Sequence, residues 1–240
     1  THIVRYFNAW WEDGRLYIQT ELCRSSLRDV MDQAGGALGL EACVGVLQQM
    51  LLGLSLIHAH NMCHLDVKPA NIFIATNDDE GATIYKLGDL GLATLNGNAS
   101  DVIEGDSKYL PRELLLEDFD RLPMADIYSL GATVLEMGLG RALPGHGDEW
   151  QKMRDGLLPL DELAPGMDEL KNVLRWMMHP DPSERPTAAE LLRHPLFRSE
   201  VETLLHQERA LASGLQEKLT EVMQQQAHYG PTKLKRTVTV

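Results

Sequence analysis

One short stretch of the chain places an acid, a cation and an amide at a spacing suited to phosphoryl transfer. Residues 64–73 read His-Leu-Asp-Val-Lys-Pro-Ala-Asn-Ile-Phe, and their reactive groups are Asp66, Lys68 and Asn71. An Asp can accept the proton of an attacking hydroxyl, a nearby Lys can neutralise the transferring phosphoryl group, and an Asn can hold a metal ion that bridges phosphates. A polar turn between a helix and a strand is the alternative. The order and spacing of the three groups favour a catalytic loop.

A second acidic group follows a predicted strand. Residues Thr83–Leu87 are rich in branched and aromatic side chains, which is typical of a strand, and the triplet Asp-Leu-Gly at 89–91 comes soon after them. An isolated Asp-Leu-Gly triplet means little by itself. This triplet gains weight because residues 64–73 precede it.

The chain is predicted to start with a hairpin. Ile3–Trp11 and Arg15–Glu21 have the branched and aromatic side chains of strands, and Glu12-Asp13-Gly14 between them has turn chemistry. The first residue is Thr rather than Met, so we expect the chain to begin inside a fold. Leu22–Ser25 then connects this hairpin to the helices that follow.

The spacing of apolar residues predicts helices on both sides of the reactive groups. Ser26 can cap a short helix that runs to about Gln33 and ends at Gly35-Gly36. Apolar residues recur at helical spacing over Leu40–His60, which predicts a long core helix. This helix ends shortly before residues 64–73.

Downstream of the reactive groups the chain alternates between a long loop and helices. Asp89–Glu113 is polar and contains glycine, so we predict a functional loop there. Asp126 opens an apolar helix that reaches about Gly138, and its carboxylate can bind the backbone of the catalytic loop from below. Further helical segments are predicted over Asp148–Asp155, Met167–His179 and Thr187–His194.

Beyond Phe197 the character of the sequence changes. One apolar stripe on a charged and Gln-rich background predicts an amphipathic helix over residues 199–226. A basic tail that looks disordered follows it to residue 240. The stripe is consistent with packing on the chain's own domain and equally with binding of a partner helix.

The composition limits the classes of function. The chain has 240 residues, of which 44% are hydrophobic and 24% charged, as in ordinary globular proteins. A formal charge of -13 argues against general nucleic-acid binding, because phosphate backbones require a basic face. Cys23, Cys43 and Cys63 are expected to be buried thiols in a reducing compartment. We expect no signal peptide and no apolar run long enough to cross a bilayer, and hence a nuclear or cytoplasmic protein.

The motifs resemble those of protein kinases, and in particular the Wee family of cell-cycle inhibitory kinases. The likeness extends over about Ile3 to Phe197. It implies an α+β, protein-kinase-like fold made mainly of the helical large lobe plus the last two strands of the small lobe, with a C-terminal helical tail. The stretches that carry the likeness are 64–74, 88–91, 104–110 (Glu-Gly-Asp-Ser-Lys-Tyr-Leu), 122–127 and 178–182.

The resemblance also divides the chain and assigns roles to residues. The implied kinase domain is 1–198, with a small-lobe remnant at 1–21, a hinge at 22–25 and the large lobe at 26–198, followed by the helix and tail at 199–240. Asp66 is the implied catalytic base, and Lys68 supports the transferring phosphate. Asn71 and Asp89 are implied to bind Mg²⁺. The residues implied to bind ATP are Thr20, Glu21, Cys23, Lys68, Asn71, Phe73 and Asp89, and those implied to be structural are His64, Glu113, Asp126 and Arg185.

Two of these roles have alternatives. Phe73 can form the floor of the adenine pocket or be an ordinary core aromatic. His64 can be a metal ligand, but no Cys or His is suitably spaced to join it, so we expect a packed histidine under the Asp-Leu-Gly turn. Glu113 and Arg185 are expected to form a buried ion pair.

The resemblance implies an ATP- and Mg²⁺-dependent kinase that phosphorylates an inhibitory tyrosine of a cyclin-dependent kinase and so delays mitosis. Lys68 after the catalytic Asp is, by itself, typical of serine/threonine kinases. Two alternatives stay open. One is a Ser/Thr kinase of the type that acts on translation initiation factor 2, which Leu16–Gln19 and Glu21–Cys23 also resemble. The other is a non-catalytic binding module formed by the large lobe and its helical tail.

The glycine-rich loop and the phosphate-pairing Lys of a kinase are expected upstream of Ile3. We therefore expect residues 1–240 by themselves to be catalytically impaired, because losing one preorganised donor to a developing charge typically slows a reaction about 10²–10³-fold.

Leu65 predicts how the activation segment, the predicted loop Asp89–Glu113, is ordered. Many kinases carry Arg at this position, and its guanidinium grips a phosphate on that segment. Leu has no donor and no charge, so we expect the active arrangement to form without phosphorylation, ordered by the Glu-Gly-Asp-Ser run at 104–107. Lys108 or Arg112 binding the phosphate is the alternative. The hydroxyls that a phosphate could modify are those of Thr94, Ser100, Ser107 and Tyr109.

Overall fold

The structure, a computed structural model, describes residues 1–76, 83–97, 102 and 105–197. The described residues belong to the unit that runs from Thr1 to Phe197. The predicted helix at 199–226 and the basic tail lie outside the described residues, as do Ser100 and Glu104 of the activation segment.

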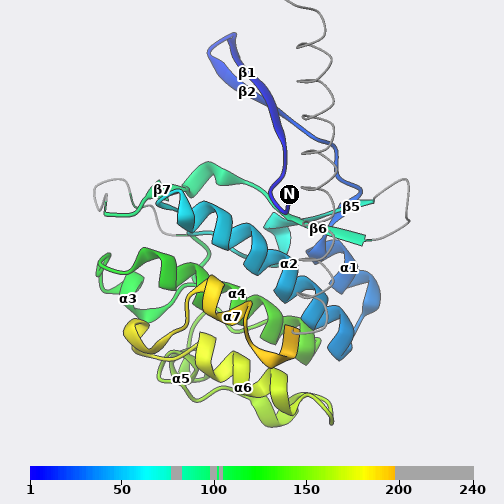
Figure 1. Cartoon of the computed structure of the whole chain (residues 1–240), viewed down its shortest axis with the longest axis vertical. Coiled ribbons are helices and arrows are strands. Elements are labelled where there is room, and N and C mark those ends of the chain that lie inside the picture. The colour runs from blue at the N-terminus through cyan, green and yellow to red at the C-terminus, as the bar shows by residue number, and fades with distance from the viewer. Residues whose placement is uncertain (77–82, 98–101, 103–104, 198–240) are drawn as a thin grey trace, which may run out of the picture. The chain divides into compact units, whose positions relative to one another are not determined.

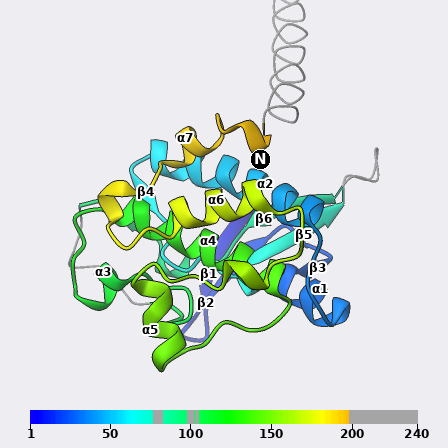
Figure 2. The same cartoon turned by 90° about the horizontal axis from the view of Figure 1, so that it is seen from below.

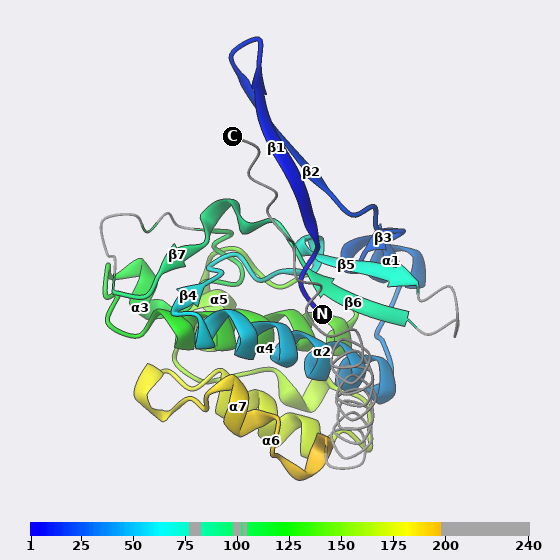
Figure 3. The ribbon, with the colours of Figure 1, turned by 45° about the horizontal axis from the view of Figure 1, so that its top comes forward.

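The chain starts with the predicted hairpin, drawn in dark blue in Figure 1. β1 (Tyr6–Glu12) pairs antiparallel with β2 (Arg15–Thr20). Asp13 and Gly14 between them have φ values of 49° and 72°, as a tight turn with two left-handed residues requires. Most side chains of both strands are exposed. In Figure 3 the hairpin extends away from the helices.

A second sheet, of strand order β3-β5-β6, lies beside the helices. β5 leaves the catalytic loop and its antiparallel partner β6 leads back to Asp89, so this pair brings the two parts of the predicted site together (Figure 3). A separate pair joins β4 (Met62–Cys63) to β7 (Thr94–Leu95). Strands of two residues are too short to leave a periodic pattern, so the sequence does not predict this pairing. The strands of the second sheet are β3 (Ser25–Ser26), β5 (Ile72–Thr76) and β6 (Thr83–Leu87).

The long helix α2 (Leu40–Ala59) lies at the centre of the helices. It contacts α4 (Leu122–Leu139), β6 and α7 (Ala188–Leu191), so it buries side chains on more than one face (Figures 1 and 2). By length and apolar composition α2 qualifies as a membrane span, which corrects the expectation that no apolar run is long enough. Because 56% of its most apolar window is buried inside the structure, it serves here as a core helix. Its fully buried residues include Cys43, Val46, Leu47, Met50, Leu51 and Leu54.

Helix α4 is buried along almost all of its length. It begins at Leu122 rather than at the predicted Asp126, because Pro123 is favoured in a first turn, where its fixed φ suits the helix and its missing N–H has no partner to lose. It ends at Gly140, whose φ of 64° is left-handed. Together with the sheets, the helices give the predicted α+β fold.

The other described helices are α1 (Leu27–Ala34), α3 (Arg112–Leu115), α5 (Asp148–Arg154) and α6 (Asp168–Met177). Of these, α1, α5 and α6 lie where the sequence predicts helical segments, as does α7. The short 3-10 turns are η1 (Pro69–Asn71), η2 (Leu90–Leu92), η4 (Leu160–Glu162), η5 (Pro182–Glu184) and η6 (Pro195–Phe197).

Candidate active site

Asp126 of α4 lies against the backbone of the catalytic loop. Its Oδ1 accepts a hydrogen bond from Leu65 N at 2.8 Å, and its Oδ2 accepts one from His64 N at 2.8 Å and lies 2.8 Å from His58 Nε2. The carboxylate is fully buried. These bonds hold Leu65 at a φ of 62°, a left-handed conformation that costs a non-glycine residue about 1–2 kcal/mol. Asp126 therefore stabilises a loop conformation that the chain would not adopt by itself.

His64 is fully buried between the catalytic loop and the turn that carries Asp89. Its Nε2 lies 2.9 Å from Gly88 O, and its Nδ1 accepts from Asp66 N at 3.3 Å. Because Nδ1 accepts, Nε2 carries the proton and donates to Gly88 O. Within the described part of the chain, no group of three or more His, Cys, Asp and Glu could hold a metal ion.

The catalytic loop brings Asp66, Lys68 and Asn71 into direct contact. Lys68 Nζ lies 2.8 Å from Asp66 Oδ2 and 3.0 Å from Oδ1. Asn71 Nδ2 donates to Asp66 Oδ2 at 2.7 Å and to its main-chain oxygen at 2.9 Å. Asp66 is only 9% exposed, so little water competes for these bonds. A carboxylate held by an ammonium and an amide points in one direction, as acceptance of a proton from a bound hydroxyl requires.

Asp89 follows a glycine that is tied to the catalytic loop. Its φ and ψ are 58° and 73°, and its Oδ1 accepts from Gly91 N at 3.3 Å. Gly88 N donates to Asn71 O at 2.9 Å, which connects the two predicted metal ligands through one main-chain bond. A Cβ on Gly88 would lie 2.8 Å from the Phe73 ring, so a side chain there would displace that ring.

The donor atoms of Asn71 and Asp89 fit a magnesium ion. Asn71 directs its amide nitrogen toward Asp66, which leaves its Oδ1 as a potential ligand, and Asp89 is exposed. Carboxylate and amide oxygens are hard ligands of the kind Mg²⁺ prefers, and this ion usually completes its shell with water and substrate phosphates. These two side chains are therefore the ones that would hold Mg²⁺.

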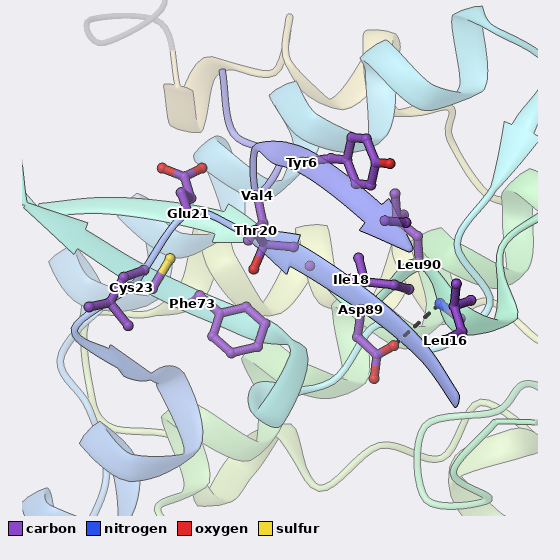
Figure 4. Close-up of a pocket in the computed structure, with 14 residues that line it drawn as sticks. Val4, Tyr6, Leu16, Ile18, Thr20, Glu21, Cys23, Phe73, Asp89 and Leu90 are labelled. Atoms are coloured by element: carbon purple, nitrogen blue, oxygen red, sulfur yellow. Dashed lines mark hydrogen bonds between the residues drawn. The ribbon is translucent and has the colours of Figure 1, made fainter. Parts of the chain in front are cut away.

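A pocket of about 720 Å³ opens beside Asp89, between the hairpin and β5 (Figure 4). Its volume is within the range of about 300–1,000 Å³ found for small-molecule sites. Lys68 and Asn71 are not among its lining residues, and they contact Asp66 instead. Sequence reasoning missed Val4 and Ile18, which also line it. The predicted ATP-binding residues that line the pocket are Thr20, Glu21, Cys23, Phe73 and Asp89.

Lys86 on β6 holds Glu21 at the end of β2. Its Nζ lies 2.7 Å from each oxygen of the Glu21 carboxylate, and Arg5 N donates to Oε1 at 2.6 Å. Burial by itself would raise the pKa of Glu21, but the hydrogen bonds from Lys86 and then from Arg5 hold it below its ordinary value. The carboxylate is thus engaged within the protein. Sequence reasoning missed this pair, and the only local signal was a Lys inside an otherwise apolar strand.

The three cysteines differ in exposure. Cys43 and Cys63 are 0% exposed, and burial raises their pKa values to about 11 and about 12. Cys23 lines the pocket and is only partly buried, which corrects the expectation that all three thiols are buried. The reason is that the connection from β2 to β3 forms a wall of the pocket rather than part of the core.

Leu65 packs into an apolar cluster and is 2% exposed. An aliphatic side chain fits this cluster and offers no donor to a phosphate. Of the alternative phosphate ligands, Arg112 already pairs with Asp155 at 3.2 Å. The other buried members of the cluster are Cys63, Leu110, Leu114, Leu122 and Ala125.

The hydroxyls of the activation segment differ in access. Tyr109 is 5% exposed, its hydroxyl donates to Glu136, and it accepts from Arg28 Nη2 at 3.0 Å. Burial and then the Glu136 carboxylate raise the pKa of Tyr109 above its ordinary value. Thr94 is also buried, whereas Ser107 is exposed. Sequence reasoning missed Arg28 and Glu136, although Glu136 is a signal as the one charge in the apolar stretch of α4 that follows Asp126, because buried charges are almost always paired.

Glu113 and Arg185 face each other in the interior. Arg185 Nη2 donates to Glu113 Oε2 at 3.0 Å, and Nη1 donates to Oε1. Their exposed fractions are 5% for Arg185 and 7% for Glu113. Arg185 Nε also donates to His179 O at 2.7 Å, and Nη1 donates to Met124 O at 3.1 Å. The pair therefore joins α3 to the segment around η5 and to the first turn of α4.

Known proteins resemble this chain over most of its length. The protein kinase domain family matches residues 1–197. A Wee1-like protein kinase of Oryza sativa subsp. japonica is 40% identical across 82% of this chain and 36% of its own length. Wee1-like protein kinase 2 of Homo sapiens is 34% identical across 99% of this chain and 47% of its own length. A Wee1-like protein kinase of Drosophila melanogaster is 37% identical across 82% and 36%.

The chain thus spans less than half the length of these curated relatives. The matched region contains the whole site described above, including the catalytic loop, the Asp89 turn and the pocket. It also contains the stretches of sequence that resemble those of Wee kinases. This chain therefore belongs to the protein kinase domain family, in its Wee-like branch.

Proposed function

We propose that this domain binds ATP with Mg²⁺ and transfers the γ-phosphoryl group to a hydroxyl of a protein. The observation that carries the proposal is the Asp66 carboxylate, held by Lys68 and Asn71, in a loop that His64 and Asn71 join to Gly88, the residue before Asp89 in the lining of the pocket. The apolar pocket suits a flat base such as adenine. Asn71 and Asp89 would hold Mg²⁺, which would neutralise charge on the phosphates.

Asp66 and Lys68 have separate roles in the proposed reaction. Asp66 orients the acceptor hydroxyl and takes its proton as the oxygen attacks the γ-phosphorus. Lys68, 2.8 Å from that carboxylate, is placed to offset the negative charge of the transferring group. A bond forms between the acceptor oxygen and phosphorus, the bond to the β-phosphate breaks, and ADP leaves.

We further propose that the acceptor is the inhibitory tyrosine of a cyclin-dependent kinase, in the nucleus or the cytoplasm. This substrate follows from the likeness to the Wee family, whereas Lys68 taken alone favours serine or threonine. The comparisons give no support to a kinase of initiation factor 2 or to a non-catalytic module. The helix predicted at 199–226 is a proposed binding element for a partner helix.

Phosphoamino-acid analysis tests this assignment. Protein expressed from the complete coding sequence is incubated with radiolabelled ATP, Mg²⁺ and either a cyclin-dependent kinase or initiation factor 2. The matched control is Asp66→Asn in the same protein. We expect phosphotyrosine on the cyclin-dependent kinase with wild type and none with the control. Phosphoserine on the initiation factor would overturn the proposed substrate.

A further inference from the structure

Arg154, the last residue of α5, is a buried cation without an acidic partner among the described residues. It is 1% exposed, and its Nε is buried without a hydrogen-bond partner. Burial lowers the pKa of its guanidinium. Arg185, which is also buried, is paired with Glu113. Removing a cation from water without a counter-charge is costly, so the contacts that Arg154 does make require an explanation.

These contacts converge on the activation segment. Arg154 Nη2 donates to Ser107 O at 2.6 Å and to Lys108 O at 3.3 Å. Its guanidinium lies 3.8 Å from the centroid of the Trp150 ring, and Nη1 donates to Trp150 O at 3.0 Å. Trp150 Nε1 donates to the same Ser107 oxygen at 3.0 Å. Two side chains of α5 thus fix one carbonyl of the activation segment.

The same segment touches the catalytic carboxylate. Asp106 N lies 3.4 Å from Asp66 Oδ1, as a long hydrogen bond. A Cβ on Gly105 would lie 2.8 Å from that oxygen and 2.7 Å from Leu65 O, so the backbone here packs directly on the catalytic loop. Lys108 N donates to Asp106 Oδ1 at 3.1 Å, which closes a turn. The segment Gly105–Lys108 therefore links α5 to the catalytic base.

We propose that Arg154 is a positioning residue for the acceptor protein: with Trp150 it sets the place of Gly105–Lys108 beside Asp66, where the acceptor hydroxyl must arrive. The inference rests on the proposed kinase activity. It concerns the acceptor and not the nucleotide, because neither Arg154 nor Gly105–Lys108 lines the pocket. Loss of Arg154 weakens use of the acceptor and leaves use of ATP unchanged.

The test compares Arg154→Met, Arg154→Lys and Trp150→Phe in protein from the complete coding sequence. Trp150→Phe keeps the ring and removes only the Nε1 donor, so it tests the same anchor if Arg154→Met folds poorly. The control is Arg141→Met, because Arg141 pairs with Glu149 of α5 at 2.7 Å without touching Ser107. KM and kcat are measured for the acceptor and for ATP. Hydrogen exchange of residues 105–110 is measured without any acceptor.

We expect Arg154→Met to lower kcat/KM for the acceptor about tenfold or more, with KM for ATP within twofold of wild type. Arg154→Lys should recover part of the loss, since an ammonium can reach one carbonyl. Exchange at 105–110 should rise about tenfold in Arg154→Met and stay unchanged in Arg141→Met.

Unchanged exchange, or a parallel loss of ATP affinity, would overturn the inference. The kinetic comparison uses whichever acceptor the wild type phosphorylates, including a Glu-Tyr copolymer. A wild type that ignores the cyclin-dependent kinase therefore contradicts the proposed substrate and not the role of Arg154.

Discussion

Replacing Asp126 by Asn removes the carboxylate that supports the catalytic loop. In the wild type that carboxylate accepts from Leu65 N through Oδ1, and from His64 N and His58 Nε2 through Oδ2. An Asn side chain has one acceptor oxygen and one amide group. In either orientation its amide faces a main-chain N–H, so one buried donor loses its acceptor.

The magnitude follows from these bonds. Leaving one buried N–H unsatisfied costs about 1–3 kcal/mol. Each bond that survives loses its charged acceptor, which lowers its contribution by about 1 kcal/mol. One or two bonds survive, depending on the orientation of the Asn side chain, so we expect the free energy of unfolding to fall by about 2–5 kcal/mol. The lost bonds also hold Leu65 in its left-handed conformation, so Asp66 next to it shifts. A shift that raises the activation free energy of phosphoryl transfer by about 1.4 kcal/mol would lower turnover about tenfold.

Urea unfolding followed by tryptophan fluorescence measures the first quantity, and phosphoryl transfer by the same preparations measures the second. The control is Asp161→Asn, since the Asp161 side chain makes no hydrogen bond or ion pair within the described ranges and lies on the surface. A loss of less than 1 kcal/mol in Asp126→Asn, or an equal loss in the control, would refute the reasoning.

Three further predictions use other parts of the site. At pH 8, iodoacetamide should modify Cys23 of the native protein and spare Cys43 and Cys63, whose raised pKa values of about 11 and about 12 leave almost no thiolate. ATP with Mg²⁺ should slow the modification of Cys23. Mass spectrometry that finds Cys63 modified first would contradict this prediction. Phosphatase-treated protein should keep its turnover, because Leu65 offers no phosphate ligand; a large loss that phosphorylation of Ser107 restores would show that the segment is switched. The variant Glu21→Gln should be less stable than wild type at neutral pH. The folded pKa of Glu21 lies below its ordinary 4.5, so its stabilisation is complete above about pH 4.5 and is lost as pH falls through the folded value. The difference between the two melting temperatures should shrink as the pH falls below about 4.5, and a difference that stays constant over that acid range would count against the Lys86 pair.

The sequence predicts those parts of the site that lie close together in the chain. Asp66, Lys68 and Asn71 are separated by a few residues, so their spacing alone indicates their mutual contact. The turn at Asp89 follows from a similarly local pattern, because the predicted strand Thr83–Leu87 comes directly before it.

The contacts that sequence reasoning missed join residues far apart in the chain. Arg28 meets Glu136 across 108 residues, and Lys86 meets Glu21 across 65. No periodicity or motif encodes such a pair, since the partners meet only once the helices and sheets have packed. Arg154 is a similar case, because nothing local distinguishes it from an exposed helix-terminal arginine.

In the proposed reaction, Asp66 accepts a proton in phosphoryl transfer from ATP, and Asn71 and Asp89 would hold Mg²⁺. The most direct test is turnover of Asp66→Asn, measured as transfer of radiolabelled phosphate to the acceptor, beside the Kd for ATP measured in the presence of Mg²⁺. Loss of a general base typically slows a reaction about 10²–10⁴-fold, so we predict a fall of that size with the Kd for ATP within twofold of wild type. Turnover within threefold of wild type would show that Asp66 is not the proton acceptor.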